Sequence, residues 1–189
     1  MQVQAGAGPA GNGLGNGQAQ TGARTGGTRA RPPGKARGQP GQLLRWHDGC
    51  YEVKGREVTL TTELKNYNGD GAYVAIYLTD AKGRYQDILW IAGKKSKYYK
   101  HLKDWARGSR KQRAEYDGKT GASLTSGHTL TTTVDLDDAL FDAGYQLRLD
   151  TAVEDQRDQR AEVIAPLTTA GAGQPVAGRG YVKSFTYQL

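Results

Sequence analysis

Glu57-Val58-Thr59-Leu60-Thr61-Thr62-Glu63-Leu64-Lys65 decides the fold class, because its side chains alternate between two kinds of face. One face carries Val58, Leu60, Thr62 and Leu64, and the other carries charged residues and threonines. Successive side chains of a β-strand point to opposite faces of a sheet, so this period of two predicts a strand that buries one side.

Similar runs recur at short intervals along the chain. In Ala72–Asp80, Val74, Ile76 and Leu78 fall on one face, and Tyr73, Ala75 and Tyr77 fall on the other. Further strands are expected over Tyr85–Ile91, His128–Leu136, Tyr145–Val153, Ala161–Thr168 and Gly180–Tyr187, with turn residues such as Lys82-Gly83 and Ala143-Gly144 between some of them. Many short strands at this spacing indicate a mainly β fold, an antiparallel Ig-like β-sandwich. The pattern leaves the strand order open.

One segment departs from strand periodicity. In Ser96–Ala106, Tyr98, Leu102 and Trp105 recur at helical spacing, and Ser96 is a suitable N-cap. This predicts a single short amphipathic helix packed on the sandwich. The polar stretch Arg107–Tyr116 is expected to be a loop.

The N-terminal part differs in composition from the rest. Residues 1–41 consist mainly of Gly, Ala, Gln, Asn and Pro, with five Lys and Arg residues and no acid. They contribute +5 of the formal net charge of +7, which leaves 7 − 5 = +2 for the remainder. Such a segment cannot bury enough apolar surface to fold. We therefore expect a disordered tail over residues 1–44 and one β-sandwich domain over residues 45–189.

Thiol and metal chemistry find little support in the sequence. Cys50 is the single cysteine, so it cannot form an intramolecular disulfide, and its role is open. The histidines are scattered without ligand spacing, and Asp135, Asp137 and Asp138 lack the glycine and final glutamate of a calcium loop. Glu154–Arg160 alternates in charge and is interpreted as a solvated hairpin end. No stretch is apolar enough for a transmembrane helix, and no signal peptide is recognisable after Met1.

The motif with the clearest chemical meaning is Asp117-Gly118-Lys119-Thr120-Gly121-Ala122-Ser123. It fits D-x-x-[ST]-G-A-[ST] and resembles the acceptor site at which the FAD:protein FMN transferase attaches flavin mononucleotide (FMN) outside the bacterial cytosol. In that resemblance Ser123 is the acceptor hydroxyl. Gly121 and Ala122 add almost no bulk beside it, and Asp117 and Thr120 offer hydrogen bonds that hold a bent loop. The structural alternative is a plain turn between helix and strand.

A wider set of segments is similar to the predicted-periplasmic family catalogued as domain of unknown function 2271. The resemblance covers roughly Val58 to Leu189. It is carried by Tyr73–Tyr77, Ile88–Ile91, Lys97-Tyr98, Leu102, Trp105, Asp117–Ser123, Ser126-Gly127 and Gly144–Leu147. It implies a small exported β-rich protein, encoded near PepSY-type membrane proteins that resemble reductases. The chain departs from the acceptor pattern at Lys119, where a small or apolar residue is usual, and by having no visible export signal.

Together these features predict an extracytosolic, periplasmic electron-transfer protein that carries FMN as a covalent phosphoester on Ser123 and is not itself an enzyme. Its expected partners are the FMN transferase and a PepSY-type membrane reductase. Lys100, within the basic segment 94–113, would favour an anionic flavin. Trp90, Tyr98, Tyr99 and Trp105 are candidate stacking surfaces, although packing of the helix onto the sheet is the better explanation for Tyr98 and Trp105.

Two other classes of function stay open. The basic segment with its interleaved aromatic residues is also typical of a nucleic-acid- or anion-binding module without a cofactor. A third class is an interaction sandwich that only binds a partner. The electron acceptor and the oligomeric state are not readable from the sequence.

Overall fold

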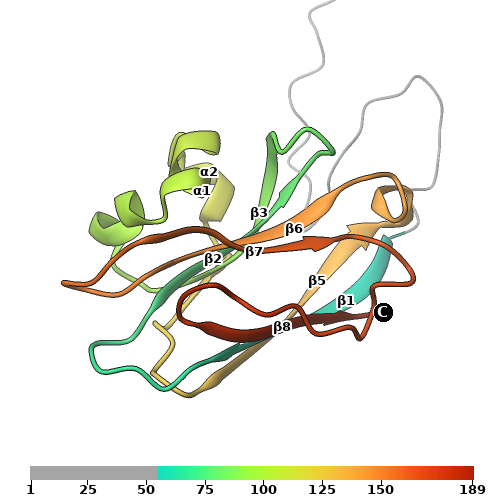
Figure 1. Cartoon of the computed structure of the whole chain (residues 1–189). Coiled ribbons are helices and arrows are strands. Elements are labelled where there is room, and N and C mark those ends of the chain that lie inside the picture. The colour runs from blue at the N-terminus through green and yellow to red at the C-terminus, as the bar shows by residue number, and fades with distance from the viewer. Residues whose placement is uncertain (1–54) are drawn as a thin grey trace, which may run out of the picture. The chain divides into compact units, whose positions relative to one another are not determined.

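The computed structural model describes residues 55–189, which form two packed sheets with short helices on one outer face (Figure 1). The expected tail over residues 1–44, Cys50 and the first ten residues of the expected 45–189 domain lie outside the described part. The strands are β1 Gly55–Leu64, β2 Tyr73–Thr79, β3 Tyr85–Ala92, β4 Thr120–Gly121, β5 Thr129–Asp137, β6 Gln146–Ala152, β7 Gln159–Pro166 and β8 Val182–Gln188.

The sheets have the orders β5-β1-β8 and β4-β3-β2-β6-β7. All pairs are antiparallel except β3–β4, which is parallel. The seven strands expected from the sequence are confirmed, each within about two residues at its ends. The two-residue strand β4 was not expected, and it is formed by the Asp117–Ser123 motif.

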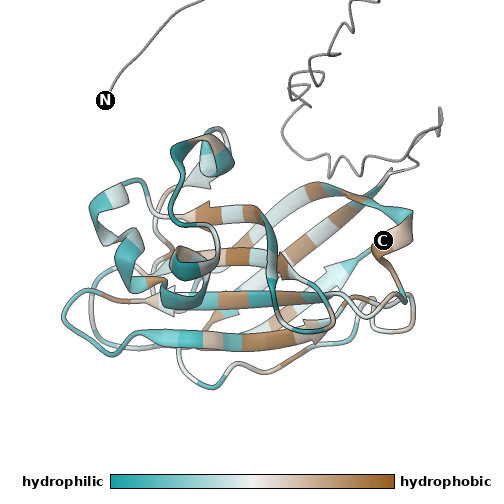
Figure 2. Cartoon of the chain, turned by 90° about the horizontal axis from the view of Figure 1, so that it is seen from above, coloured by the Kyte–Doolittle hydropathy of each residue, from teal (hydrophilic) through white to brown (hydrophobic). Residues whose placement is uncertain are grey.

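The core between the sheets follows from the alternation in the sequence. Val58, Leu60 and Leu64 of β1 face Val74, Ile76 and Leu78 of β2 within one buried cluster. The stripes of apolar and polar residues along the strands are visible in Figure 2. Burial of these side chains is the main favourable contribution to folding.

A second, smaller core lies on the outer face of the five-stranded sheet. Ala75 and Tyr77 of β2 point to this face, together with Ile88 and Ile91 of β3. Tyr99, Leu102 and Trp105 of the helical segment cover them, so both faces of β2 are buried. This explains why the second face of β2 is also apolar or aromatic.

The prediction of one continuous helix over Ser96–Ala106 is wrong. The chain forms a 3₁₀ helix η1 Ser96–His101, then α1 Lys103–Gly108, and later a single turn α2 Arg113–Tyr116 within the expected loop. The break falls at Leu102, whose φ of −81° and ψ of 75° are not helical. Its side chain is fully buried, and the Asp150 carboxylate accepts hydrogen bonds from the N–H groups of Asp104 and Trp105 (2.7 and 2.9 Å). The hydrogen bonds to Asp150 therefore satisfy the first turn of a new helix, α1, which begins at Lys103.

Among residues 55–189, no helix is both long and apolar enough to cross a membrane. The same residues contain no group of three or more His, Cys, Asp or Glu side chains placed to hold a metal ion.

Candidate functional site

The Asp117–Ser123 motif begins where α2 ends. The Asp117 N–H donates to the Arg113 carbonyl (3.0 Å), and the Lys119 N–H donates to the Tyr116 carbonyl (3.0 Å). Gly118 between them has a φ of +78°, a left-handed conformation that glycine adopts without strain. The first half of the motif is therefore a helix-terminating turn, as the structural alternative predicted.

The second half of the motif is fixed to the sheet on both sides of the expected acceptor. The Ile91 and Gly93 N–H groups of the β3 edge donate to the Lys119 and Gly121 carbonyls (both 2.9 Å). Leu124 then exchanges two backbone hydrogen bonds with Ala72 (2.7 and 2.9 Å). Ala122 and Ser123 lie between these anchors and are exposed. The loop thus leaves Ser123 exposed to solvent while its ends are held.

Lys119 is directed away from the acceptor. Its Nζ donates to the Ile88 carbonyl (2.7 Å) and forms an ion pair with Asp87 Oδ2 (3.0 Å), and only 14% of its side chain is exposed. The ammonium group therefore anchors the motif to β3. The departure from the usual acceptor pattern changes how the loop is attached and adds no charge beside Ser123.

Two glycines make room for side chains of the motif region. A Cβ atom at Gly71 would lie 2.8 Å from Ser123 Oγ, and one at Gly121 would lie 2.8 Å from the Trp90 indole. Real Cβ atoms essentially never make contacts this close, so Ser123 packs directly over the backbone of Gly71, and Trp90 over that of Gly121. The small residue at Gly121 is thus required by internal packing as well as by the proposed access of a second enzyme.

The aromatic candidates lie on different sides of the sheet. Trp90 packs against the core between the sheets, and its buried indole N–H has no hydrogen-bond partner among residues 55–189. Trp105 is fully buried in the outer core, with ring centroids 5.6 Å from Tyr99 and 6.0 Å from Tyr116. Trp105 therefore offers no face for a flavin, and the packing interpretation applies to it. Trp90 is partly exposed and stays a candidate. Lys100 is exposed on the helical cover, which is the set of short helices η1, α1 and α2 on this outer face.

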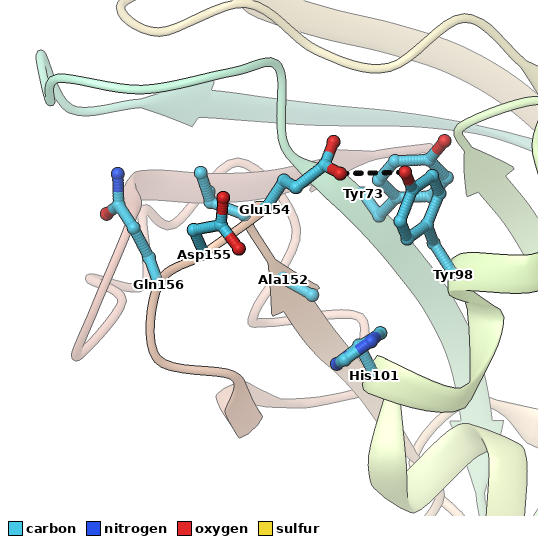
Figure 3. Close-up of a pocket in the computed structure, with 8 residues that line it drawn as sticks. Tyr73, Tyr98, His101, Ala152, Glu154, Asp155 and Gln156 are labelled. Carbon is cyan, nitrogen blue, oxygen red and sulfur yellow. Dashed lines mark hydrogen bonds between the residues drawn. The ribbon is translucent and has the colours of Figure 1, made fainter.

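Tyr98 lines a cavity of about 230 Å³ on the same outer face (Figure 3). The Tyr73 and Tyr98 rings lie together, 5.3 Å between centroids, and the Tyr98 hydroxyl donates to Glu154 Oε1 (2.7 Å). Burial is the main cause that raises the pKa of Tyr73, so its phenol is neutral at physiological pH. The remaining lining residues are His101, Ala152, Val153, Asp155 and Gln156.

The interpretation of Glu154–Arg160 as a solvated hairpin end is wrong in part. Besides the Tyr98–Glu154 bond, Asp158 pairs with Lys103 (3.1 Å) and His101 (3.3 Å), and Arg160 pairs with Asp104 (2.5 Å). These contacts tie the β6–β7 turn to the helical cover. The alternating charges in the sequence indicated that these residues are polar. Their ion-pair partners could not be predicted, because those partners lie far away in the sequence, on the helices.

Comparison with known proteins gives one match. The model of the family described as predicted periplasmic protein (DUF2271) matches residues 55–184, which is nearly all of the described part. No curated protein and no solved structure matches the chain.

Proposed function

Because the chain belongs to this family of predicted periplasmic proteins, we propose that it is an extracytosolic electron-transfer protein carrying FMN covalently on Ser123. The observation that carries the proposal is that Ser123 is exposed on a loop anchored at both ends. The neighbouring Ala122 is small and exposed, and the Lys119 ammonium is withdrawn to Asp87. A transferase could reach this hydroxyl without unfolding the sheet.

The attachment itself would exchange one phosphorus–oxygen bond for another. The Ser123 oxygen attacks the phosphorus of the FMN half of FAD, the bond to the AMP half breaks, and AMP leaves. The hydroxyl proton passes to a base of the transferase. The product is a phosphoester, and the protein gains the mass of FMN less one water.

The bound flavin would supply the redox chemistry, and the protein would position it and set its electrostatic surroundings. The helical cover carries exposed cations. Among them, Lys97 Nζ lies 4.5 Å from the Tyr98 ring centroid. Positive charge favours an anionic reduced ring. The electron donor in this proposal is a PepSY-type membrane reductase, and the protein has no catalytic turnover of its own.

The alternative function is a basic nucleic-acid- or anion-binding module without cofactor. It is supported by the exposed lysines and arginines of segment 94–113, several of which have no acidic neighbour in the described part. Excess absorbance at the nucleotide band in the purified protein, with no flavin absorbance, would favour this alternative.

The deciding experiment is the intact mass of the protein after export to the periplasm together with a flavin transferase. We expect one FMN on the wild type and none on Ser123→Ala. Thr120→Ala should be modified incompletely, because Thr120 belongs to the motif without being the acceptor. Thr125→Ala is the matched control: it removes an exposed hydroxyl two residues beyond Ser123 and should be fully modified. Flavin retained on Ser123→Ala, or an unmodified wild type, would contradict the proposal.

A further inference from the structure

The cavity beside Tyr73 and Tyr98 lies on the same face of the sheet as the Ser123 hydroxyl. Ala72 points into the core between the sheets, so its neighbours Gly71 and Tyr73 face outward. Ser123 Oγ packs where a Gly71 side chain would stand, and Tyr73, the first residue of β2, lies two residues further along the chain. Two residues of extended chain span at most roughly 7 Å. The hydroxyl and the cavity wall are therefore neighbours.

A second contact joins the cavity rim to this loop. The Gln156 side chain donates to the Asn68 carbonyl, and it lies against Gly69, two residues before Gly71. The loop that accommodates Ser123 thus also touches the far wall of the cavity. Figure 3 shows Gln156 and Asp155 on one side of the cavity, with the Tyr73 and Tyr98 rings on the other.

We infer that this cavity holds the isoalloxazine ring of a flavin tethered to Ser123, with the ring against the Tyr73–Tyr98 pair. The inference rests on the proposed function. The cavity of about 230 Å³ is smaller than the roughly 300–1,000 Å³ of common ligand pockets. It therefore suits part of a ring system, with the ribityl phosphate chain lying outside, at the start of β2 between Ser123 and Tyr73.

The chemistry of the walls fits a flat, partly polar ring. The tyrosine rings supply an aromatic wall, and Ala152 and Val153 supply apolar contact. The Gln156 amide and the Glu154 carboxylate lie at the rim, where the polar edge of a flavin needs partners. A tether raises the local concentration of the ring to the order of millimolar, so a modest affinity keeps it in place. The ring would be shielded on one side and open to an electron-transfer partner on the other.

The test compares flavin fluorescence at equal FMN content, which intact mass establishes for each sample. Stacking on tyrosine quenches flavin emission, so we expect the folded wild type to emit severalfold less than the same protein unfolded in urea. Tyr98→Leu should recover most of the lost emission. Glu154→Ala should recover part of it, because it removes only the carboxylate that orients Tyr98. Glu154 is exposed, so this variant keeps the fold even if Tyr98→Leu does not.

Tyr145→Leu is the matched control, since Tyr145 is a half-buried tyrosine that precedes β6, at the opposite end of this strand from Ala152. It should stay as quenched as the wild type. Modified protein whose emission is the same folded and unfolded, and unchanged in Tyr98→Leu, would overturn the inference while leaving Ser123 as the acceptor. Protein with no FMN in the mass spectrum would overturn the proposed function and this inference with it.

Discussion

Asp150 and Glu162 are the acidic side chains that the described chain buries, and each holds a segment outside the sheets. Asp150 accepts hydrogen bonds from Tyr77 and Ala161 at Oδ1 (3.0 and 2.7 Å), besides those from the first turn of α1 at Oδ2. Glu162 accepts from the Gly180 and Val182 N–H groups (2.8 and 2.6 Å). A buried carboxylate is tolerated only with such partners. These residues fix the helical cover and the segment that enters β8.

Asp150→Asn should destabilise the protein. The new amide places an NH₂ group where one carboxylate oxygen stood, so at least one backbone N–H loses its acceptor. This costs about 1–3 kcal/mol for each buried donor left without one. The measurement is urea unfolding at neutral pH. Asp138→Asn is the control: its carboxylate pairs with Arg56 at a side chain that is 40% exposed, and such pairs contribute about 0–1 kcal/mol. Equal losses in the two variants would contradict the role of Asp150.

The difference in unfolding free energy between the wild type and Asp150→Asn should change with pH in one direction. Burial is the main cause that raises the pKa of Asp150, and the hydrogen bonds from Trp105 and Ala161 oppose it. A carboxyl whose pKa is higher in the folded state stabilises the fold most below its unfolded pKa of about 4. That contribution is lost as pH rises through the folded pKa. The stability gap between wild type and Asp150→Asn should therefore narrow above about pH 4, and a gap that widens would contradict the shift.

At the scale of single elements, the position of β4 depends on the contact between Trp90 and Gly121, which lie 31 residues apart in the sequence. Gly121 leaves room for the Trp90 indole, and the two carbonyl contacts with Ile91 and Gly93 hold the strand against β3. A parallel strand of two residues covers the edge of β3, which is otherwise open to pairing with another chain. The motif loop is thus a structural part of the sheet edge as well as the candidate acceptor site.

Gly121→Ala should therefore displace β4, and Trp90→Leu should relieve the effect by opening space. In a double-mutant cycle we expect a coupling free energy of about 0.5–3 kcal/mol, as for other residues in contact. Urea unfolding of the wild type, both single variants and the double variant gives this value. Gly121→Ala paired with Leu130→Ala, a change in β5 of the other sheet, serves as the control and should show additive effects. Additivity in the Trp90 cycle would show that glycine is not required for packing.

At the scale of the whole molecule, the sequence predicted the parts whose information is local. The period-two runs located every long strand, because burial of one face requires that alternation. The break at Leu102 was not predictable, since it depends on Asp150, which lies 48 positions later and on another strand. The cavity beside Ser123 was missed for the same reason. Its walls come from β2, the helical cover and the β6–β7 turn, and only Tyr98 among them was predicted as a site residue.

The sandwich core and the outer core share β2 and β3, so we expect them to unfold together. Leu60 belongs to the first and Leu102 to the second, and both are fully buried. Leu60→Ala and Leu102→Ala should each cost about 2–5 kcal/mol, the usual range for such cavities. In urea, far-ultraviolet circular dichroism, which reports the sheets, and near-ultraviolet dichroism, which reports the packed aromatic rings, should give one shared midpoint in every variant. If Leu102→Ala separated the two midpoints, the helical cover would be an independent unit. The cavity wall formed by Tyr98 would then be able to open while the loop bearing Ser123 stayed folded.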